Sequence, residues 1–417
     1  MIVKSGSIPG LNPSIDQDKQ LLLESLSKRK LKEGVFVDAQ GESITIADHN
    51  GKDGTCLYPK AYGWLIGFND SSSGKLGLRK DLEKILWNEQ NQNIVQLTTD
   101  NDLQSSAYRL LEKLKTSDGS VIVLENSTGK IKALASKGPA ELNNNDPQTF
   151  ISEANKTTDG FLWRGIEEAY PPGSTFKLIT GAAAIEKGIS KEELIYNDTG
   201  VFQCADGSDP VQNYGGYAYG QIDLANAYEV SSNTYFANLA LKVGNSYMIE
   251  TAKKLRFNDS IQLDFCSLNS SFSLDGTDFS LSQAGFGQGK TLLSPLHLVM
   301  MFQTIANDGI MMKPYIIESI KSGEKTTYNG STEHLSKAFS KKTCQFIRKA
   351  AKSAANAYGL PSYTTFAKSG TAEISDNQTM SYLGACDHQY TYLISCKDVS
   401  SSMDLYVPMI ELMSLTK

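Results

Sequence analysis

The chain has 417 residues, of which 40% are hydrophobic, enough for a sizeable core and for two domains. Its net charge is −6 and it has no long basic run, which argues against duplex nucleic acid as a partner. Its apolar stretches fall far short of the roughly 18–20 residues of a membrane span, and its first residues lack the basic-then-apolar pattern of a signal peptide. The chain is therefore either cytosolic or lacks a leading anchor, and composition leaves both open.

Six cysteines are scattered along the chain without a C-x-x-C pair, and the four histidines do not cluster near them. The spacing of a zinc site is therefore absent, and we expect neither a metal nor a cofactor. Cys386 and Cys396 are close in sequence, but a hairpin would place them out of register. We expect mostly free, buried thiols.

Residues 1–95 are predicted to form a separate, irregular module. The pattern predicts a polar helix over about 16–31, β-like pieces in GVFVD, ESITIAD and GWLIGF, a polar loop in GFNDSSSGKLG, and a helix near 79–88.

Residues 96–417 are predicted to form a second, larger module. Its expected elements are a strand in IVQLTT, a helix in DLQSSAYRLLEKL, two strands around a turn at Asn126–Gly129, a helix after Lys177, a polar stretch over about 197–220, a helical region broken at 231–233, a long helix stopping near Gly309, a helix near 341–357, strands in TTFAKSGTAE, SYLGAC and TYLISC, and an amphipathic helix over about 403–416. Strands from both ends must join one sheet with helices between them. The fold class is therefore mixed α/β of the α+β type, with a largely antiparallel central sheet flanked by helices.

Residues 170–177 read Tyr-Pro-Pro-Gly-Ser-Thr-Phe-Lys, and an apolar helical run follows directly. Because a helix advances about 3.6 residues per turn, Ser174 and Lys177 share one face. The Pro-Pro-Gly segment favours a sharp helix start, so Ser174 is expected where free N–H groups favour an anion. A serine beside an amine that can take its proton is typical of an acyl-transfer nucleophile. Taken alone, the pattern also fits an ordinary helix start with a serine cap and a solvated lysine.

Two further polar segments can pair with this one. Ser231-Ser232-Asn233 interrupts an apolar helical region and can present a hydroxyl and an amide to a cleft, although a capped kink is the simpler interpretation. Lys368-Ser369-Gly370-Thr371 lies on a predicted strand. Its lysine and hydroxyls can hold a carboxylate, and Gly370 allows a ligand backbone to approach closely, although a lysine-protected edge strand is the simpler interpretation.

Taken together, the ordered motifs S-x-x-K, S-x-N and K-S-G resemble those of penicillin-binding proteins and class A β-lactamases. The chain is most similar to the transpeptidase domain of a class B penicillin-binding protein. The segments LTTDNDLQSSA, GSVIVLENSTGKIKALAS, YPPGSTFKLITGAAAIEKG and GFGQGKTLLSPLHLVMMFQTIANDG extend the resemblance over roughly 95–395. Ninety-five N-terminal residues are too few for a glycosyltransferase module, which argues against class A.

The first 95 residues resemble only weakly the non-catalytic pedestal of class B proteins. GVFVDAQGESIT stands where that family usually has an Arg-Gly-x-Ile-x-Asp-Arg-(Asn/Asp)-Gly segment. The arginines are lost, which leaves the packing and the partner contacts of this module open.

Two other patterns are interpreted as coincidences. AGFGQGKT at 284–291 nearly matches a phosphate-binding loop, but Ala284 replaces the first glycine and no apolar strand precedes it. Glu193 and Asn197 form an E-x-x-x-N, which positions a deacylating water in class A β-lactamases. Here it precedes Ser231, whereas in those enzymes it lies between the second and third motifs.

The chemistry expected is serine acyl transfer, with Ser174 attacking a peptide carbonyl. Lys177 must be neutral to take the proton of Ser174, and burial and the charge of Lys368 would both lower the pKa of its amine. The resemblance implies that the backbone N–H groups of Ser174 and Thr371 hold the oxyanion. Ser231 would pass a proton to the departing amine, and Asn233 would hydrogen-bond Lys177 and the substrate amide.

The Lys368–Thr371 segment is expected to bind the substrate. Ser369 and Thr371 would grip the terminal carboxylate, and strand 366–373 could pair with the extended peptide. The resemblance implies cell-wall stem peptides as partners, with a D-Ala-D-Ala donor and an amine acceptor. A β-lactam would mimic the donor and acylate Ser174.

The resemblance also implies a location and further partners. It predicts the extracytoplasmic face of a bacterial cell membrane, an N-terminal membrane anchor that this sequence does not show, and a membrane glycan polymerase as a partner. It leaves open a role in elongation, division or sporulation, and the chemistry of the stem peptide.

Three alternatives stay open. The first is a D,D-carboxypeptidase. The second is a serine β-lactamase: Ser-Thr-Phe-Lys also occurs in class D enzymes, but their second motif is S-x-V, and this chain is far longer. The third, of another class, is a non-catalytic β-lactam sensor or a scaffold for cell division. The three intact motifs argue against a scaffold, and a sensor would need a long multi-span membrane portion that this sequence does not show.

Overall fold

The computed structural model describes residues 33–47, 53–70, 73–87, 91–114, 116–142, 146–375 and 378–417. The helix predicted over about 16–31 lies outside these residues. Within the described part of the chain, every helix is too short or too polar to cross a bilayer.

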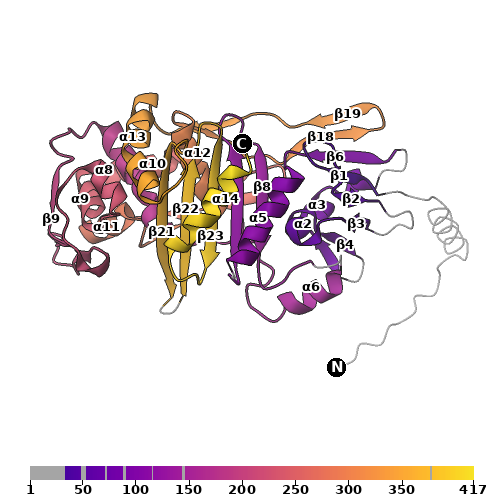
Figure 1. Ribbon diagram of the computed structural model, residues 1–417, viewed down its shortest axis with the longest axis horizontal. Helices are drawn as coiled ribbons and strands as arrows, with labels where there is room; N and C mark the ends of the chain where they lie inside the picture. The colour runs from indigo at the N-terminus through magenta and orange to yellow at the C-terminus, as the bar shows by residue number, and fades with distance from the viewer. Residues whose placement is uncertain are drawn as a thin grey trace, which may run out of the picture.

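A five-stranded sheet forms the centre of the molecule (Figure 1). Its strands, in spatial order, are β21 (Phe366–Ser375), β22 (Gln378–Cys386), β23 (Tyr390–Lys397), β7 (Gly119–Glu125) and β8 (Ile131–Lys137). Every neighbouring pair is antiparallel. The prediction of a mixed fold with an antiparallel sheet built from both ends of the larger module is therefore confirmed.

Helices cover both faces of this sheet. Helices α5 (Asn101–Lys113) and α14 (Tyr406–Ser414) lie on one face (Figure 1). Leu111 of α5 comes so close to β7 that a Cβ atom built onto Gly119 would lie 3.2 Å from its side chain. An added Cβ at Gly384 of β22 would lie 2.4 Å from the ring of Phe302, which places α12 (Pro295–Ala306) on the opposite face. Because α12 is buried on all sides, its sequence is apolar nearly throughout.

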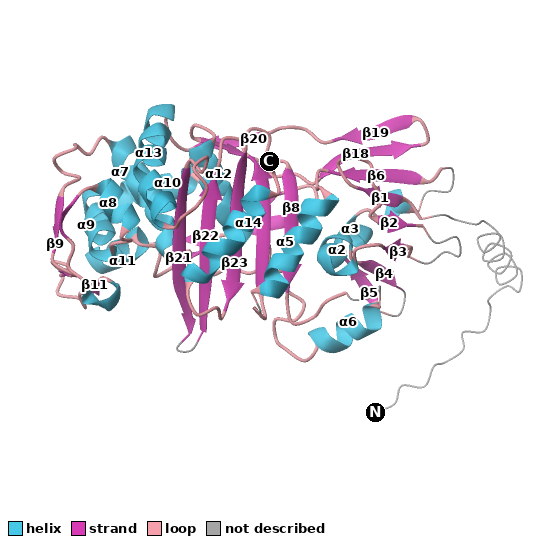
Figure 2. Ribbon diagram, viewed as in Figure 1, coloured by secondary structure: helices cyan, strands magenta, loops and turns pink. Residues whose placement is uncertain are grey.

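A lobe of helices adjoins β21, as Figure 2 shows. Its helices are η2 (Gly173–Phe176), α7 (Lys177–Lys187), η3 (Tyr214–Gly216), α8 (Leu224–Glu229), α9 (Asn233–Val243), α10 (Asn245–Lys254), α11 (Asp278–Gly285) and α13 (Lys341–Ala357). The short strands within and beside it are β9 (Tyr196–Asp198), β10 (Val201–Phe202), β11 (Val211–Gln212), β12 (Gly220–Ile222), β13 (Ser260–Gln262), β14 (Ser267–Asn269), β15 (Ser271–Phe272), β16 (Thr291–Leu292), β17 (Ile310–Met312) and β20 (His334–Lys337). The predicted helices before and after the break at 231–233, and the one over 341–357, are confirmed.

A second sheet lies at the other end of the molecule. It joins β1 (Val35–Val37), β6 (Asn93–Leu97), β18 (Ile317–Ser322) and β19 (Lys325–Asn329), in that order. Strand β6 crosses the boundary predicted at residue 95, and β18 and β19 come from much later in the chain. The N-terminal residues therefore share a sheet with the larger module.

The remaining N-terminal elements correct two predictions. They are β2 (Thr45–Ile46), β3 (Thr55–Cys56), α2 (Pro59–Ile66), β4 (Phe68–Asp70), β5 (Gly74–Leu76), α3 (Gly77–Asp81) and α4 (Glu83–Leu86), and α6 (Pro147–Ala154) packs nearby. GWLIGF was predicted as β-like but lies mostly in helix α2, because Pro59 begins a helix that buries the apolar run and ends at Gly67, where φ is 66°. The segment predicted as a polar loop contains the antiparallel pair β4–β5.

Buried charges hold this end of the molecule together. Arg79 of α3 donates from Nε to Glu33 Oε1 at 2.9 Å, and both side chains are almost fully buried. The same guanidinium donates to the carbonyls of Gly54 and Gly67. Because each buried charge has a partner, this ion pair links four chain segments without leaving an isolated charge.

Candidate active site

Ser174 lies in the 3₁₀ turn that leads into helix α7, and its side chain is half-buried. The turn packs closely against two other segments. Gly173 donates its N–H to Gly287 O at 2.9 Å, and an added Cβ at Gly287 would lie 1.9 Å from Gly173 O. An added Cβ at Gly173 would lie 2.5 Å from Thr371 O. Glycine at 173 and 287 therefore allows the nucleophile turn to sit against both the turn that follows α11 and strand β21.

Ser231 lies in the break between α8 and α9, where the sequence predicted a polar interruption. Its φ is 56°, in the left-handed region that serine seldom adopts. Both its carbonyl and its hydroxyl reach Lys177: Nζ donates to Ser231 O at 2.7 Å and lies 3.1 Å from Ser231 Oγ. The unusual backbone thus places two oxygens of one residue on the same amine.

Lys177 is fully buried, and its hydrogen-bond partners among the described residues are all oxygens. Besides Ser231, its Nζ lies 2.8 Å from Asn233 Oδ1. Burial and the positive charge of Lys368 hold the pKa of Lys177 well below its usual range. Among the described residues no carboxylate contacts this amine, so no opposite charge offsets the cost of burying its own charge.

The hydrogen count agrees with a neutral Lys177. A neutral amine has two hydrogens and one lone pair, and the carbonyl of Ser231 and Oδ1 of Asn233 can only accept. The lone pair then accepts the hydroxyl hydrogen of Ser231, whose oxygen in turn accepts a hydrogen bond from Lys368 Nζ at 3.0 Å. All these contacts are satisfied with one lysine neutral and one charged.

The Lys368–Thr371 segment lies on β21, directly beside the nucleophile turn. An added Cβ at Gly370 would lie 2.9 Å from the backbone nitrogen of Thr175 and 3.1 Å from that of Ser174. Lys368 and Ser369 are buried, whereas Thr371 is exposed. The structure therefore brings all eight predicted site residues together: Ser174, Lys177, Ser231, Asn233, Lys368, Ser369, Gly370 and Thr371.

A buried network behind Asn233 was missed by the sequence analysis. Asn213 Oδ1 accepts from the N–H groups of Asn233 and Thr234 at 2.8 and 3.1 Å. Its amide donates to Asp198 at 2.8 and 3.0 Å, and Ser232 donates to the same carboxylate at 2.5 Å. Asp198 and Asn213 lie in the polar stretch over 197–220, whose only signal in the sequence was its richness in Gly and Tyr.

Tyr358 was also missed. It follows helix α13, and its hydroxyl contacts Lys368 and Ser369. Nothing in the local pattern of α13 distinguishes this tyrosine from a residue that closes the helix.

The structure agrees that neither the AGFGQGKT segment nor the Glu193–Asn197 pattern has the function that it resembles. Gly285 ends helix α11 and β16 follows it, which is the reverse of the strand-to-helix order of a phosphate-binding loop. Glu193 is exposed and accepts a hydrogen bond from the backbone of Ser190 within its own turn.

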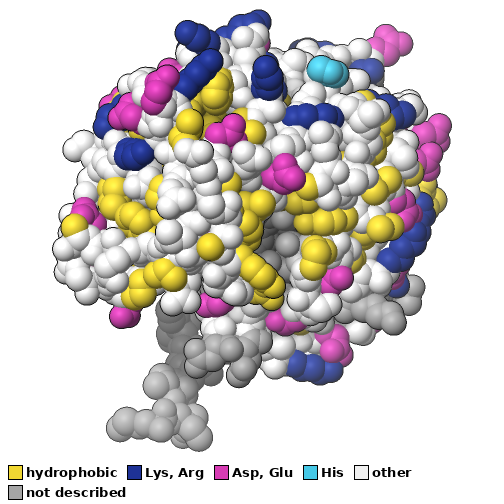
Figure 3. All heavy atoms as spheres, turned by 60° about the vertical axis from the view of Figure 1, so that its left-hand side comes forward, with side chains coloured by type: hydrophobic (Ala, Val, Ile, Leu, Met, Phe, Trp, Pro, Cys, Tyr) yellow, Lys and Arg dark blue, Asp and Glu magenta, His cyan; other side chains and the backbone are white. Residues whose placement is uncertain are grey.

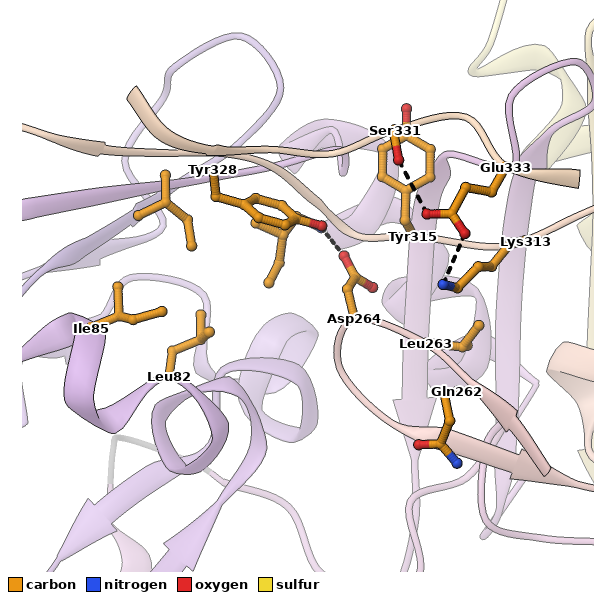
Figure 4. A pocket seen from close by; sticks show the side chains of 12 residues that line it. Leu82, Ile85, Gln262, Leu263, Asp264, Lys313, Tyr315, Tyr328, Ser331 and Glu333 are labelled. Atoms are coloured by element: carbon orange, nitrogen blue, oxygen red, sulfur yellow. Dashed lines mark hydrogen bonds and ion pairs between the residues drawn. The ribbon is translucent and has the colours of Figure 1, made fainter. Parts of the chain in front are cut away.

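A cavity of about 380 Å³ lies elsewhere, between α3–α4, the β13–β14 turn and β18–β19 (Figure 4). Asp264 accepts there from the backbone N–H groups of Ile316 and Ile317, at 3.0 and 2.7 Å, and the hydroxyl of Tyr328 points toward it. Lys313 pairs with Glu333 at its rim. None of the predicted site residues lines this cavity.

Exposed hydrophobic side chains gather on the face of the helical lobe, as Figure 3 shows. In the stretch over 197–220, the exposed hydrophobic residues include Val201, Tyr214 and Tyr217. The six cysteines are thiols and not disulfides, and all but Cys266 are buried, as predicted. Among the described residues, no group of His, Cys, Asp or Glu could hold a metal ion.

Solved structures share this fold. The D,D-transpeptidase domain of a peptidoglycan glycosyltransferase from Eggerthella lenta superposes with a TM-score of 0.84 at 22% identity, over 93% of this chain and 98% of that one. The penicillin G acyl-enzyme complex of penicillin-binding protein A from M. tuberculosis gives a TM-score of 0.83 at 20% identity, over 93% of this chain and 100% of that one.

Sequence relatives point the same way. The peptidoglycan D,D-transpeptidase PbpA of Mycolicibacterium smegmatis is 33% identical over 227 residues, which are 51% of this chain and 46% of the relative. Penicillin-binding protein 3 of Bacillus subtilis is 28% identical over 313 residues, which are 70% of this chain and 42% of the relative. The chain thus spans about half the length of the curated relatives that it matches. The family model for the penicillin-binding protein transpeptidase domain matches residues 119–392, and the chain therefore belongs to this family.

Proposed function

We propose that this protein is a peptidoglycan D,D-transpeptidase that cross-links stem peptides through an acyl-enzyme on Ser174. The observation that carries the proposal is the shared hydroxyl of Ser231, which lies 3.1 Å from the amine of Lys177 and 3.0 Å from that of Lys368. One serine thereby couples a buried amine beside the nucleophile to a charged lysine on the strand that would bind the substrate.

In the proposed acylation, Ser174 Oγ attacks the carbonyl carbon of the penultimate D-Ala. Lys177, neutral at the start, takes the hydroxyl proton of Ser174. As the C–N bond breaks, Ser231 gives its proton to the departing amine and regains one from Lys177, which is neutral again. In the resting site the lone pair of Lys177 accepts from Ser231, so a substrate nitrogen that draws the Ser231 hydroxyl away frees this lone pair for Ser174.

Backbone N–H groups would hold the developing oxyanion. Those of Ser174 and Thr371 belong to the nucleophile turn and to β21, which the close contacts at Gly173 and Gly370 hold together. Such a donor typically lowers the barrier by about 3–4 kcal/mol. Lys368, Ser369 and Thr371 would bind the terminal carboxylate, and an amine of a second stem peptide would then attack the acyl-enzyme.

The alternative reactions differ in the second step. A D,D-carboxypeptidase or a β-lactamase passes the acyl group to water. The exposed, locally bonded position of Glu193 offers no base for such a water, which favours the transpeptidase. A scaffold for division would not need the coupled lysines.

The remaining proposals follow from this activity. Residues 1–95 would form the non-catalytic pedestal module and 96–417 the transpeptidase domain. Because peptidoglycan is cross-linked outside the cell, the protein would act at the extracytoplasmic face of the membrane, beside a membrane glycan polymerase that supplies the glycan strands.

A fluorescent penicillin tests the proposal. The intact protein should form an adduct that survives for hours, and Ser174→Ala should form none. Ser414→Ala, which changes an exposed serine of α14, should label as the unchanged protein does. Rapid release of hydrolysed drug would favour the β-lactamase. No adduct in the intact protein, with thermal unfolding showing it folded, would overturn the acyl-enzyme.

A further inference from the structure

Tyr358 is held firmly at the back of the candidate site. Its backbone N–H donates to Ala354 O at 3.0 Å at the end of α13. Its buried ring stacks on Tyr406 of α14, with 4.6 Å between the ring centroids and 22° between the planes. The ring therefore has little freedom, and its hydroxyl is directed at β21.

The hydroxyl of Tyr358 completes the hydrogen bonding of Lys368. An ammonium group has three hydrogens. Lys368 Nζ donates to Ser231 Oγ at 3.0 Å, to Ser369 O at 2.9 Å and to Tyr358 OH at 3.3 Å. Without the tyrosine hydroxyl, one hydrogen of a fully buried cation would lose its partner, which is costly.

Three donors converge on the phenolic oxygen. Besides Lys368, the N–H of Ser369 lies 3.3 Å away and its Oγ 3.1 Å away. A neutral phenol has two lone pairs and one hydrogen of its own. The ammonium of Lys368 and the N–H of Ser369 can only donate, so they occupy the two lone pairs of the neutral phenol. The phenol must therefore donate its own hydrogen to Ser369 Oγ. Tyr358 then donates to Ser369, and the hydroxyl hydrogen of Ser369 can turn to a bound ligand or, without one, to the hydroxyl of Tyr406.

We propose that Tyr358 is a positioning residue for carboxylate recognition, which turns the hydroxyl hydrogen of Ser369 toward the substrate and fixes the ammonium of Lys368. The proposal rests on the function proposed above, because it concerns the same carboxylate. Phenol and phenolate act in opposite ways: the phenol frees the Ser369 hydrogen, and the phenolate binds it.

The charges around Tyr358 set where this change occurs. Burial raises the pKa of Tyr358, but the charge of Lys368 and the hydrogen bonds from Ser369 outweigh it and hold the pKa below its usual value. Lys368 on β21 and Tyr406 on α14 are the ionisable groups that face this hydroxyl among the described residues, and Lys177 of α7 lies beyond Ser231. As pH rises, carboxylate binding is therefore weakened at a lower pH than the pH at which an exposed tyrosine ionises.

The first test compares benzylpenicillin with its methyl ester, which lacks the carboxylate. Tyr358→Phe removes only the hydroxyl and keeps the stack on Tyr406. The ratio of the acylation rate constants for acid and ester should fall about tenfold, as expected for one hydrogen bond to a charged ligand. Tyr363→Phe, whose hydroxyl donates to Met413 O behind the site, should leave the ratio unchanged.

Two results would overturn the proposal: equal slowing of acid and ester in Tyr358→Phe, or no slowing of either. Absence of acylation in the unchanged protein would instead refute the proposed function. Ser369→Ala gives a second check, because Tyr358→Phe should change the ratio less in that background, where it acts only through Lys368. Additive losses would show that Tyr358 does not act through Ser369.

A spectroscopic titration does not require that Tyr358→Phe be active. The phenolate absorbance of the unchanged protein should show one tyrosine that ionises below the range of exposed tyrosines. In Ser369→Ala this ionisation should move to higher pH, because the variant loses one donor to the phenolate. An unmoved titration would contradict the arrangement of donors, even if Tyr358→Phe fails to fold.

Discussion

Lys177 shows how much a single side chain gains from its position in the fold. The sequence placed it one turn after Ser174, where an exposed lysine would be charged. The structure encloses its amine among Ser231 and Asn233 oxygens with Lys368 beyond them. Burial and a neighbouring cation both oppose protonation, so the residue can serve as a base.

Lys177→Ala is expected to lower the acylation rate constant by about 10²–10⁴-fold, the usual contribution of a general base. The fold should persist, because the substitution removes a buried amine that no carboxylate requires. Stopped-flow measurement with a chromogenic β-lactam, alongside thermal unfolding, checks both parts. Lys290→Ala, at an exposed lysine, is the control. Normal acylation by Lys177→Ala would exclude Lys177 as the base.

At the scale of elements, the start of helix α9 depends on a residue from outside the helix. Ser232 caps it by accepting from Tyr235 N at 3.0 Å. Asn213, from the strand-and-turn segment before α8, accepts from the next free N–H groups. The position of Asn233 therefore depends on a contact between segments twenty residues apart.

Asn213→Ala should weaken this helix start. It leaves two N–H groups and the Asp198 carboxylate without their amide partner, at an expected cost of about 1–3 kcal/mol in the free energy of unfolding. Urea unfolding measures the loss, and acylation should slow as Asn233 is displaced. Asn329→Ala, on the exposed strand β19, should change neither. Unchanged stability and acylation would show that Asp198 and Ser232 hold the segment alone.

At the scale of the whole molecule, helix α12 joins the sheet to the helical lobe, and His297 is its polar link. Its Nε2 lies 2.8 Å from Leu255 O, and a carbonyl only accepts, so Nε2 carries the hydrogen. Its Nδ1, 2.6 Å from Ser270 Oγ, therefore accepts. In the neutral ring both nitrogens have a hydrogen-bond partner. A proton added to Nδ1 would remove the lone pair that accepts the hydrogen bond from Ser270.

Burial lowers the pKa of His297 to about 4 from its ordinary 6.5, although the bond to Leu255 opposes the shift. Above pH 6.5 the ring is neutral in both states and its contribution to stability is complete. Between pH 6.5 and about 4 the unfolded chain binds a proton that the folded chain does not, so stability falls as pH falls.

The expected loss from this group is roughly 3 kcal/mol across that interval. His297→Gln should make the free energy of unfolding less dependent on pH between 4 and 6.5, measured by urea unfolding at a series of pH values. His388→Gln, at an exposed histidine, should keep the original dependence. An unchanged pH dependence in His297→Gln would show that the ring is protonated in the folded protein.

The sequence by itself determined what depends on local periodicity and on motif order. The hairpin of β22 and β23, helix α13 and the break before Asn233 follow from patterns that short segments carry by themselves. The three motifs in their order were enough to predict the family, since their residue types are those that acyl transfer needs. Where tertiary burial overrode local pattern, as in the helix α2 formed by GWLIGF, the prediction was wrong.

Only the tertiary structure decided the electrostatic state of the site. The pKa of Lys177, the two amines on the hydroxyl of Ser231, the Asn213 support and the hydroxyl of Tyr358 all arise from residues distant in sequence. The packing of β21 against the nucleophile turn, which glycines at 173, 287 and 370 permit, brings them within hydrogen-bond distance. Hydrogen bonding and desolvation act over a few ångströms, so they are fixed by the fold and not by spacing along the chain.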